Sequence, residues 1–292
     1  MFDPKCNKFP YPEQTDQHYL KLKKDRGIVF DSNYKYVDKS PAMKVKSFLL
    51  RILLCCVVFP VVRIRQGLKV KGRKNLKKHK EVIKNGIVSC ANHVHMWDYL
   101  AIMSAIVPTK PNVLIWAANI NGEWGKMMRL VGGIPIPEND RGATRAYMNA
   151  VKKLTEEGNW LHIYPEGSMW EYYRHIRPFK KGVAYVACEC DKPVLPMAFT
   201  YRKPGFIRRR IFGQIACLTL NIGEPIFANK ELSKREMRDD LTTRAHEAVC
   251  RLAGISPEDN KYPAIFDERK IKNSKRVDYY TDTYGVGYKG SW

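Results

Sequence analysis

Residues 86–98 read GIVSCANHVHMWD, and this stretch decides how the chain folds. GIVSCA has the unbroken apolar character of a strand buried on both faces, and MWDYLAIMSAI, which starts at residue 96, has that of the following helix. NHVH is then the turn between them. Because ligands in α/β sheets gather beyond the carboxyl ends of strands and near helix N-termini, this turn is a candidate functional site.

The pattern of GIVSCA repeats along the chain. From residue 68 to residue 257, short apolar segments alternate with amphipathic ones, which predicts an α/β domain with a mixed, largely parallel sheet flanked by helices. Helices are predicted over residues 143–157 and 182–190, and a third begins at a capping box formed by Ser233 and Glu236. The further strands are predicted at residues 112–118, 132–136, 159–164, 194–201 and 215–223.

The most apolar stretch, FLLRILLCCVVFPVV at residues 48–62, precedes this domain. Arg51 and Pro60 bound an uncharged run shorter than the roughly 20 residues that span a bilayer, so we expect it not to cross. Residues 63–80 add nine Lys or Arg and no acid. An apolar helix flanked by cations predicts a membrane-anchoring segment over residues 41–67, lying in the interface on the cytoplasmic face. The alternative is a buried hairpin under a solvated basic face.

The composition describes a globular and strongly basic protein. The net charge of +22, from 51 basic and 29 acidic residues, implies anionic partners such as lipid headgroups, phosphorylated substrates or nucleic acid. No signature of a DNA- or RNA-binding fold accompanies the charge, so we expect membrane lipids with anionic headgroups and no nucleic acid. Eight cysteines without a CxxC pair favour free thiols in a reducing compartment. Residues 1–40 and 258–292 are predicted to be polar extensions, the first without a secretory signal.

His93 and Asp98 are five residues apart, and on a continuous helix they would point about 140° apart. They can meet only if His93 lies in the turn and Asp98 in the first turn of the helix. The carboxylate would then accept a hydrogen bond from one ring nitrogen while the other nitrogen faces a substrate hydroxyl. The spacing therefore favours a His–Asp dyad that acts as a general base.

A zinc site is the competing interpretation of the same residues. His93, His95 and Asp98 could supply three ligands, but a zinc site usually needs a further distant ligand, and the other histidines form no recognisable ligand pair. We expect no metal. A zinc hydrolase stays an alternative, as does a non-catalytic protein that binds anionic lipid.

Four short motifs, in this order, resemble those of the glycerolipid acyltransferases, the family of the lysophosphatidic acid acyltransferases. They are Asn92-His93 with Asp98, Gly133-Ile134-Pro135-Ile136, Tyr164-Pro165-Glu166-Gly167-Ser168, and Val194-Leu195-Pro196. Their intervals also resemble the family's from roughly residue 68 to 225, and each motif falls where a strand ends or begins, as motif evidence requires.

The resemblance implies a membrane-associated O-acyltransferase of phospholipid biosynthesis. It implies transfer of a fatty acyl group from an acyl thioester, acyl-CoA or acyl-carrier protein, to the hydroxyl of a lysophospholipid such as 1-acyl-glycerol-3-phosphate. His93 would deprotonate that hydroxyl and Asp98 would orient the imidazole, so the direct transfer needs no Ser or Cys nucleophile and no cofactor. Substrate-binding positions carried over from the motifs are Asn92, Glu166, Gly167 and Ser168.

The sequence departs from the family at the basic residues that usually bind phosphate. The cation that normally closes the second motif is displaced to Arg141, and Met169 stands where another often follows the third. Arg177, Lys180 and Lys181 are candidate replacements, because guanidinium and ammonium groups pair with phosphate. The alternative for each is ordinary surface charge. The acceptor can therefore also be another lysolipid or a glycolipid.

Overall fold

The computed structural model describes residues 2–4, 25–138 and 140–260. Most of the predicted N-terminal extension, and nearly all of the predicted C-terminal extension, lie outside the described residues.

The described residues form a seven-stranded sheet in the order β1-β7-β6-β2-β5-β3-β4. Every neighbouring pair is parallel except β6 with β7, so the predicted mixed, largely parallel sheet is confirmed. The strands are β1 Lys69–Lys71, β2 Ile87–Cys90, β3 Pro111–Trp116, β4 Gly133–Ile136, β5 Trp160–Ile163, β6 Val194–Arg202 and β7 Cys217–Ile222.

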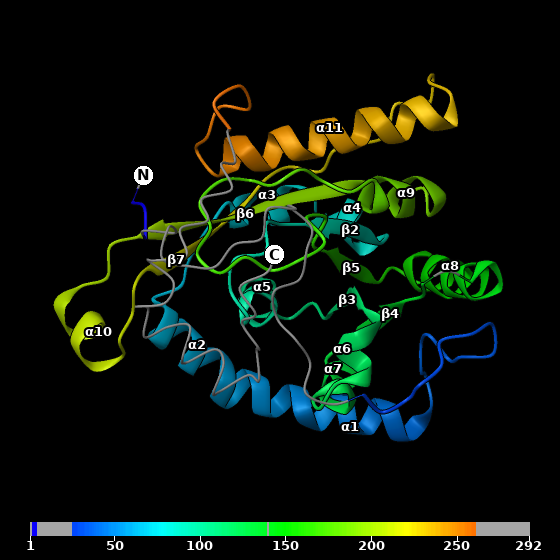
Figure 1. The fold of residues 1–292 in the computed structure, drawn as a ribbon, viewed down its shortest axis with the longest axis horizontal. Coiled ribbons are helices and arrows are strands. Elements are labelled where there is room, and N and C mark those ends of the chain that lie inside the picture. The colour runs from blue at the N-terminus through cyan, green and yellow to red at the C-terminus, as the bar shows by residue number, and fades with distance from the viewer. Residues whose placement is uncertain (1, 5–24, 139, 261–292) are drawn as a thin grey trace, which may run out of the picture.

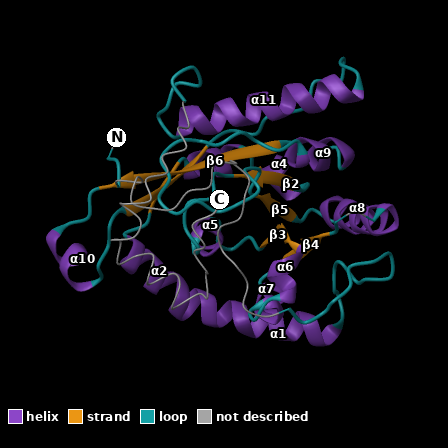
Figure 2. Cartoon of the chain, in the orientation of Figure 1, coloured by secondary structure: helices purple, strands orange, loops and turns teal. Residues whose placement is uncertain are grey.

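Helices cover both faces of the sheet (Figures 1 and 2). The strand side chains alternate between two cores. Ile87 and Trp160 pack on the face that α5 covers, whereas Val88 and Leu161 face α8, α9 and α11. This alternation explains why β2 and β5 read as unbroken apolar runs. The helices of these two layers are α5 Asp98–Ala105, α8 Arg141–Glu156, α9 Gly182–Glu189 and α11 Lys234–Leu252.

The three helices predicted downstream of the turn are confirmed as α8, α9 and α11. Ser233 caps α11, since its hydroxyl accepts from the Glu236 amide and the Glu236 carboxylate accepts in return from Ser233. Strand β1, a three-residue edge strand in a lysine-rich segment, could not be predicted from the sequence, and neither could helices too short to show a periodicity. The missed helices are α3 Arg73–Lys78, α4 Lys80–Lys84, α6 Ala117–Asn121, α7 Gly125–Leu130 and α10 Phe206–Ile211.

The N-terminal apolar segment is helical over nearly the whole of the predicted range, residues 41–67. Helix α1 (Pro41–Leu53), the π-helical turn η2 (Leu54–Val58) and helix α2 (Phe59–Gln66) join into one run of 26 residues. Pro60 does not end the run, because the widened π turn accommodates a residue that lacks an N–H and crowds the preceding turn. The prediction that the apolar segment is too short to span a bilayer is therefore wrong. Among the described residues this is one helix long and apolar enough to cross a membrane, by length and composition alone.

The helical run lies along the domain (Figure 1), and many of its apolar side chains are exposed. At its two ends the Ser47 hydroxyl donates to the Leu130 carbonyl at 3.1 Å and the Arg63 guanidinium donates to the Ser104 carbonyl. Only 22% of its most apolar window is buried, so the alternative of a buried hairpin is excluded. The large exposed apolar side chains of the run are Val45, Phe48, Leu49, Ile52, Leu53, Val57, Val61 and Ile64.

Candidate active site

His93 lies in the turn after β2, and Asp98 is the first residue of α5, as the spacing predicts. The Nδ1 atom of His93 is 3.1 Å from Oδ2 of Asp98. The same carboxylate oxygen accepts the backbone N–H groups of Val94 at 2.7 Å and His95 at 2.9 Å, so the turn wraps around it. Because the carboxylate accepts from Nδ1–H, the unprotonated nitrogen of His93 is Nε2. No described residue forms a hydrogen bond with Nε2.

The electrostatics of this pair favour a neutral imidazole. Burial, with a smaller contribution from the charge of Arg177, lowers the pKa of His93 to about 3. Burial also raises the pKa of Asp98, while the amides of Val94 and His95 oppose that shift by stabilising the carboxylate. The His93 side chain keeps 24% of its surface exposed and Asp98 keeps none. The neutral imidazole of His93 therefore reaches the surface, and the buried carboxylate of Asp98 holds it in place.

Tyr164 is a site residue that the sequence analysis missed. Its ring stacks on the His93 imidazole with centroids 3.9 Å apart and an angle of 15° between the planes. Burial raises the pKa of its phenol, so the group is neutral. The sequence contained a signal, because His93 and Tyr164 both lie at the carboxyl end of a predicted strand. These strands, β2 and β5, pair in parallel with Cys90 beside Ile163, which brings the residues after them together. The stack fixes the plane of the His93 ring.

The third motif lies beneath the turn. Glu166 Oε2 accepts the backbone N–H of His93 at 3.0 Å and the Arg177 guanidinium at 2.6 Å. Its Oε1 accepts the Arg177 backbone N–H at 3.0 Å, and the Ser168 hydroxyl accepts from the same guanidinium at 2.6 Å. Glu166, Ser168 and Arg177 are each only 1% exposed. They form a buried ionic network that supports His93 from behind.

Asn92 also supports the turn. Its side-chain amide donates to the Phe199 carbonyl at 3.1 Å and accepts the Phe199 N–H at 2.7 Å, which ties the end of β2 to β6. The side chains of Asn92, Ser168 and Arg177 are thus buried and hydrogen-bonded within the protein, and their predicted substrate contacts stay a prediction. The side chain of Glu166 likewise supports the turn instead of lining an open pocket.

Of the predicted cations, Lys180 lies against the third motif. A Cβ on Gly167, which has a φ of +80°, would lie 2.9 Å from Lys180 Cε and 3.2 Å from its Nζ, so this turn needs glycine beneath the lysine. The amide of Gly167 donates to the Tyr164 carbonyl. Lys181 instead pairs with Asp239 of α11 at 2.5 Å, and Arg141 is exposed at the start of α8.

The residues of the zinc interpretation do not converge on one point. His95 Nδ1 accepts the Trp97 N–H at 3.1 Å, and its Nε2 lies 3.5 Å from Glu171 Oε1. Over residues 2–4, 25–138 and 140–260, no group of three or more His, Cys, Asp or Glu side chains is placed to hold a metal ion.

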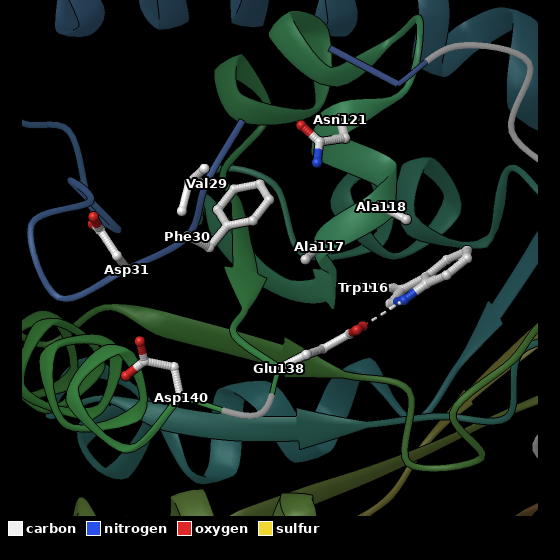
Figure 3. A pocket seen from close by; sticks show the side chains of 9 residues that line it. All are labelled: Val29, Phe30, Asp31, Trp116, Ala117, Ala118, Asn121, Glu138 and Asp140. Carbon is white, nitrogen blue, oxygen red and sulfur yellow. Dashed lines mark hydrogen bonds between the residues drawn. The ribbon is translucent and has the colours of Figure 1, made fainter. Parts of the chain in front are cut away.

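A pocket of about 420 Å³ opens at the carboxyl ends of β3 and β4 (Figure 3). Trp116, which ends β3, donates to Glu138 at 2.7 Å on its rim, and Asp31 and Asp140 add two further carboxylates. None of the predicted site residues lines it. The pocket belongs to the same edge of the sheet as His93, with β5 between β2 and β3, a lateral separation of about 10 Å. Its carboxylates would repel a phosphate.

Comparisons with known proteins agree with the motifs. Residues 67–200 match the family model described as Acyltransferase. A curated 1-acyl-sn-glycerol-3-phosphate acyltransferase of Limnanthes douglasii is 27% identical over 168 residues, 51% of this chain and 57% of that protein. The protein of Dictyostelium discoideum named Taffazin is 23% identical over 215 residues, 68% of this chain and 67% of that protein.

The chain thus spans little more than half the length of the Limnanthes relative. Among solved structures, the 1-acyl-sn-glycerophosphate (LPA) acyltransferase PlsC from Thermotoga maritima is 16% identical with a TM-score of 0.44, covering 72% of this chain and 95% of that one. The matched span, residues 67–200, contains all four motifs, the His93–Asp98 pair and the network beneath it. Over residues 67–200 this chain is therefore similar to the acyltransferase family.

Proposed function

We propose that this protein is a membrane-associated O-acyltransferase that moves a fatty acyl group from an acyl thioester to the hydroxyl of a lysophospholipid such as 1-acyl-glycerol-3-phosphate. One observation carries the proposal. In an acyltransferase domain, His93 is neutral and anchored through Nδ1 to the buried Asp98, with Nε2 left for a substrate proton. The relatives named as 1-acyl-sn-glycerol-3-phosphate acyltransferases supply the acceptor class.

The geometry supports a single direct transfer. The acceptor hydroxyl gives its proton to His93 Nε2 while its oxygen attacks the thioester carbonyl, and Asp98 stabilises the imidazolium that forms. The carbon–sulfur bond then breaks, and the leaving thiolate takes the proton back from Nε2. Acyl-CoA and acyl-carrier protein both provide the thioester this step requires. The enzyme forms no covalent intermediate and uses no cofactor.

The end of α2 joins the proposed membrane face to the catalytic turn. Gln66 Nε2 lies 3.4 Å from His95 Nε2, and the Arg65 guanidinium lies 5.1 Å from the centroid of the Trp97 ring. Both α2 residues end the helical run whose outer face is apolar. A lipid acceptor held at that face is therefore close to the base without leaving the bilayer surface.

The packing of the helical run favours a monotopic arrangement. A helix in contact with the domain near both ends, at Ser47 and Gln66, cannot cross a bilayer unless the domain enters it too. Half-immersion in the headgroup region exposes the apolar face to lipid and keeps the domain in water. The seven described cysteines are free thiols, which fits the cytoplasmic face.

Lys180 is the cation best placed to bind the phosphate of the acceptor, because its side chain crosses Gly167 at the third motif. A second acceptor class is a lysophospholipid whose headgroup also carries a cation. The three carboxylates of the pocket beyond β3 and β4 favour that class, provided the headgroup extends along the edge of the sheet.

The test is acyl transfer by the purified full-length chain in phosphatidylserine-containing vesicles, with labelled acyl-CoA and either lysophosphatidic acid or lysophosphatidylcholine. We expect labelled diacyl product and an equal amount of free thiol. Lys180→Ala should raise the KM for lysophosphatidic acid more than Lys181→Ala, the matched control. Vesicle binding without product for either acceptor would favour the non-catalytic alternative, and chelator-sensitive release of free fatty acid would favour the zinc hydrolase.

A further inference from the structure

Exposed apolar side chains are concentrated in two segments of the chain. Of the eighteen large apolar side chains exposed among the described residues, eight belong to the helical run at residues 41–66 and four to residues 206–212. On the six-residue helix α10, Phe206, Ile207 and Ile211 are 71%, 65% and 69% exposed. A cluster of this kind marks a surface that contacts an apolar partner.

Helix α10 forms the tip of the hairpin between β6 and β7, and the structure fastens this hairpin to the end of α2. The Arg208 guanidinium donates to the Ile64 carbonyl. Arg202, the last residue of β6, donates to the Gly67 carbonyl and to the Thr219 hydroxyl, the latter at 2.8 Å. Helix α10 thus stands beside the carboxyl end of the helical run (Figure 1).

The charge of both segments has one sign. Residues 202–210 read RKPGFIRRR, and neither residues 39–80 nor residues 192–223 contain an Asp or Glu. Arg209 and Arg210 are exposed, and no ion pair joins either of them to an acid of the described chain. Aromatic and branched apolar side chains interleaved with arginines fit the boundary between lipid headgroups and acyl chains, where cations meet anionic phosphates and carboxylates.

We propose that the hairpin tip, residues 203–213, is a second membrane-inserting element that docks on an anionic phospholipid bilayer beside the α1–α2 run. Phe206, Ile207 and Ile211 enter the acyl boundary, and Arg209 and Arg210 bind headgroups. A single interfacial helix leaves the domain free to roll about the helix axis. The hairpin adds a contact at one end, stops that rotation and holds the catalytic turn at a fixed height. Docking rests on the membrane association of the proposed function but not on its catalysis, so vesicle binding tests it separately from acyl transfer.

The apolar half of this proposal is tested by vesicle flotation of the full-length chain. The triple variant Phe206→Ser, Ile207→Ser, Ile211→Ser should lower the vesicle partition coefficient by at least about tenfold, because it removes three insertable side chains. The matched control is Phe227→Ser, an exposed aromatic beside Ile226, which pairs with Val194 at the opposite end of the hairpin. Both variants should keep the melting temperature of the wild type, since the altered side chains face solvent.

The electrostatic half is tested by charge reversal. Arg209→Glu with Arg210→Glu should weaken binding about tenfold to vesicles that contain phosphatidylserine, and much less to pure phosphatidylcholine. Lys234→Glu with Arg235→Glu, two exposed cations at the start of α11, is the control of equal charge. The proposal is overturned if the hairpin variants bind like their controls. It is also overturned if the wild type is dimeric without vesicles and the triple variant is monomeric, since a second copy then covers the hairpin.

Discussion

Glu166 holds two groups at once, the backbone N–H of His93 and the guanidinium of Arg177. Both members of the ion pair are 1% exposed, so removing one charge leaves the other buried without a counterion. We predict that Glu166→Gln lowers the free energy of unfolding by about 3–5 kcal/mol. Urea denaturation measures the change.

The matched control is Glu247→Gln, which breaks the exposed pair of Glu247 with Arg251 on α11. It should cost less than about 1 kcal/mol, because water screens exposed ion pairs. Equal losses in the two variants would show that the network beneath the catalytic turn does not support it.

Tyr164 offers a test of the stacked ring. Tyr164→Leu should lower kcat by about tenfold with little change in KM, because the imidazole loses the surface that fixes its plane. Tyr164→Phe keeps the stack and should retain most of the activity. A steady-state comparison of the two variants checks this, and an equal loss in both would mean that the phenol hydroxyl, not the stack, is what matters.

At the residue scale, the His93–Asp98 contact could be predicted from the sequence. Two residues five positions apart can meet only if His93 lies in the turn after the strand and Asp98 lies in the first turn of the helix. The sequence did not show that Arg177 turns inward. That requires the loop after the third motif to fold back beneath the turn, where the Trp170 and Tyr172 amides donate to the His93 and Val94 carbonyls. These long-range backbone contacts leave no periodicity in the sequence.

At the scale of elements, the outer face of the helical run makes a testable difference. Phe48 is exposed on α1, and Phe48→Asp should release the protein from phosphatidylserine vesicles, since burying a charge in the acyl region is costly. Phe227→Asp, the same change outside the proposed membrane face, should leave flotation unaltered. If Phe48→Asp still binds the vesicles, α1 does not contact the membrane.

The elements that could be predicted from sequence are those that carry a clear local signal. Strand β2 and helix α11 have unbroken apolar character and a capping box, respectively. The continuity of the N-terminal helix through Arg51 and Pro60 could not be predicted from the sequence. Arg51 reaches the Pro108 carbonyl from the helix surface, and the π turn absorbs Pro60, so neither residue interrupts the run.

At the scale of the whole molecule, two histidines with lowered pKa values link stability to pH. Burial lowers the pKa of His162 to about 3, as it does for His93. Between pH 6.5 and this value the unfolded chain binds a proton at each residue and the folded chain does not, so stability falls as the pH falls. Each group contributes a slope of up to about 1.4 kcal/mol per pH unit.

We predict that His162→Gln reduces the loss of unfolding free energy between neutral and mildly acidic pH, even if its stability at neutral pH is lower. Urea denaturation of both proteins at each pH measures the difference. A variant with the same acid-dependent loss as the wild type would show that His162 is protonated in the folded state as readily as in the unfolded one.

The sequence indicated the α/β class and a basic, lipid-facing protein through the order of its motifs and its charge. The contact between the helical run and the turn at His93 could not be predicted, because Gln66 meets His95 only once α2 lies across α5. The same is true of α10, whose Arg208 meets Ile64 across more than a hundred residues of chain.

The central claim is that His93 Nε2 removes the proton of the acceptor hydroxyl. Its most direct test is the single-turnover rate of acyl transfer from acyl-CoA to a lysophospholipid, measured for the wild type and His93→Gln in the same vesicles. We predict a rate about 10²- to 10⁴-fold lower for His93→Gln, with vesicle binding unchanged. A folded, vesicle-bound His93→Gln protein that transfers the acyl group at the rate of the wild type would contradict it.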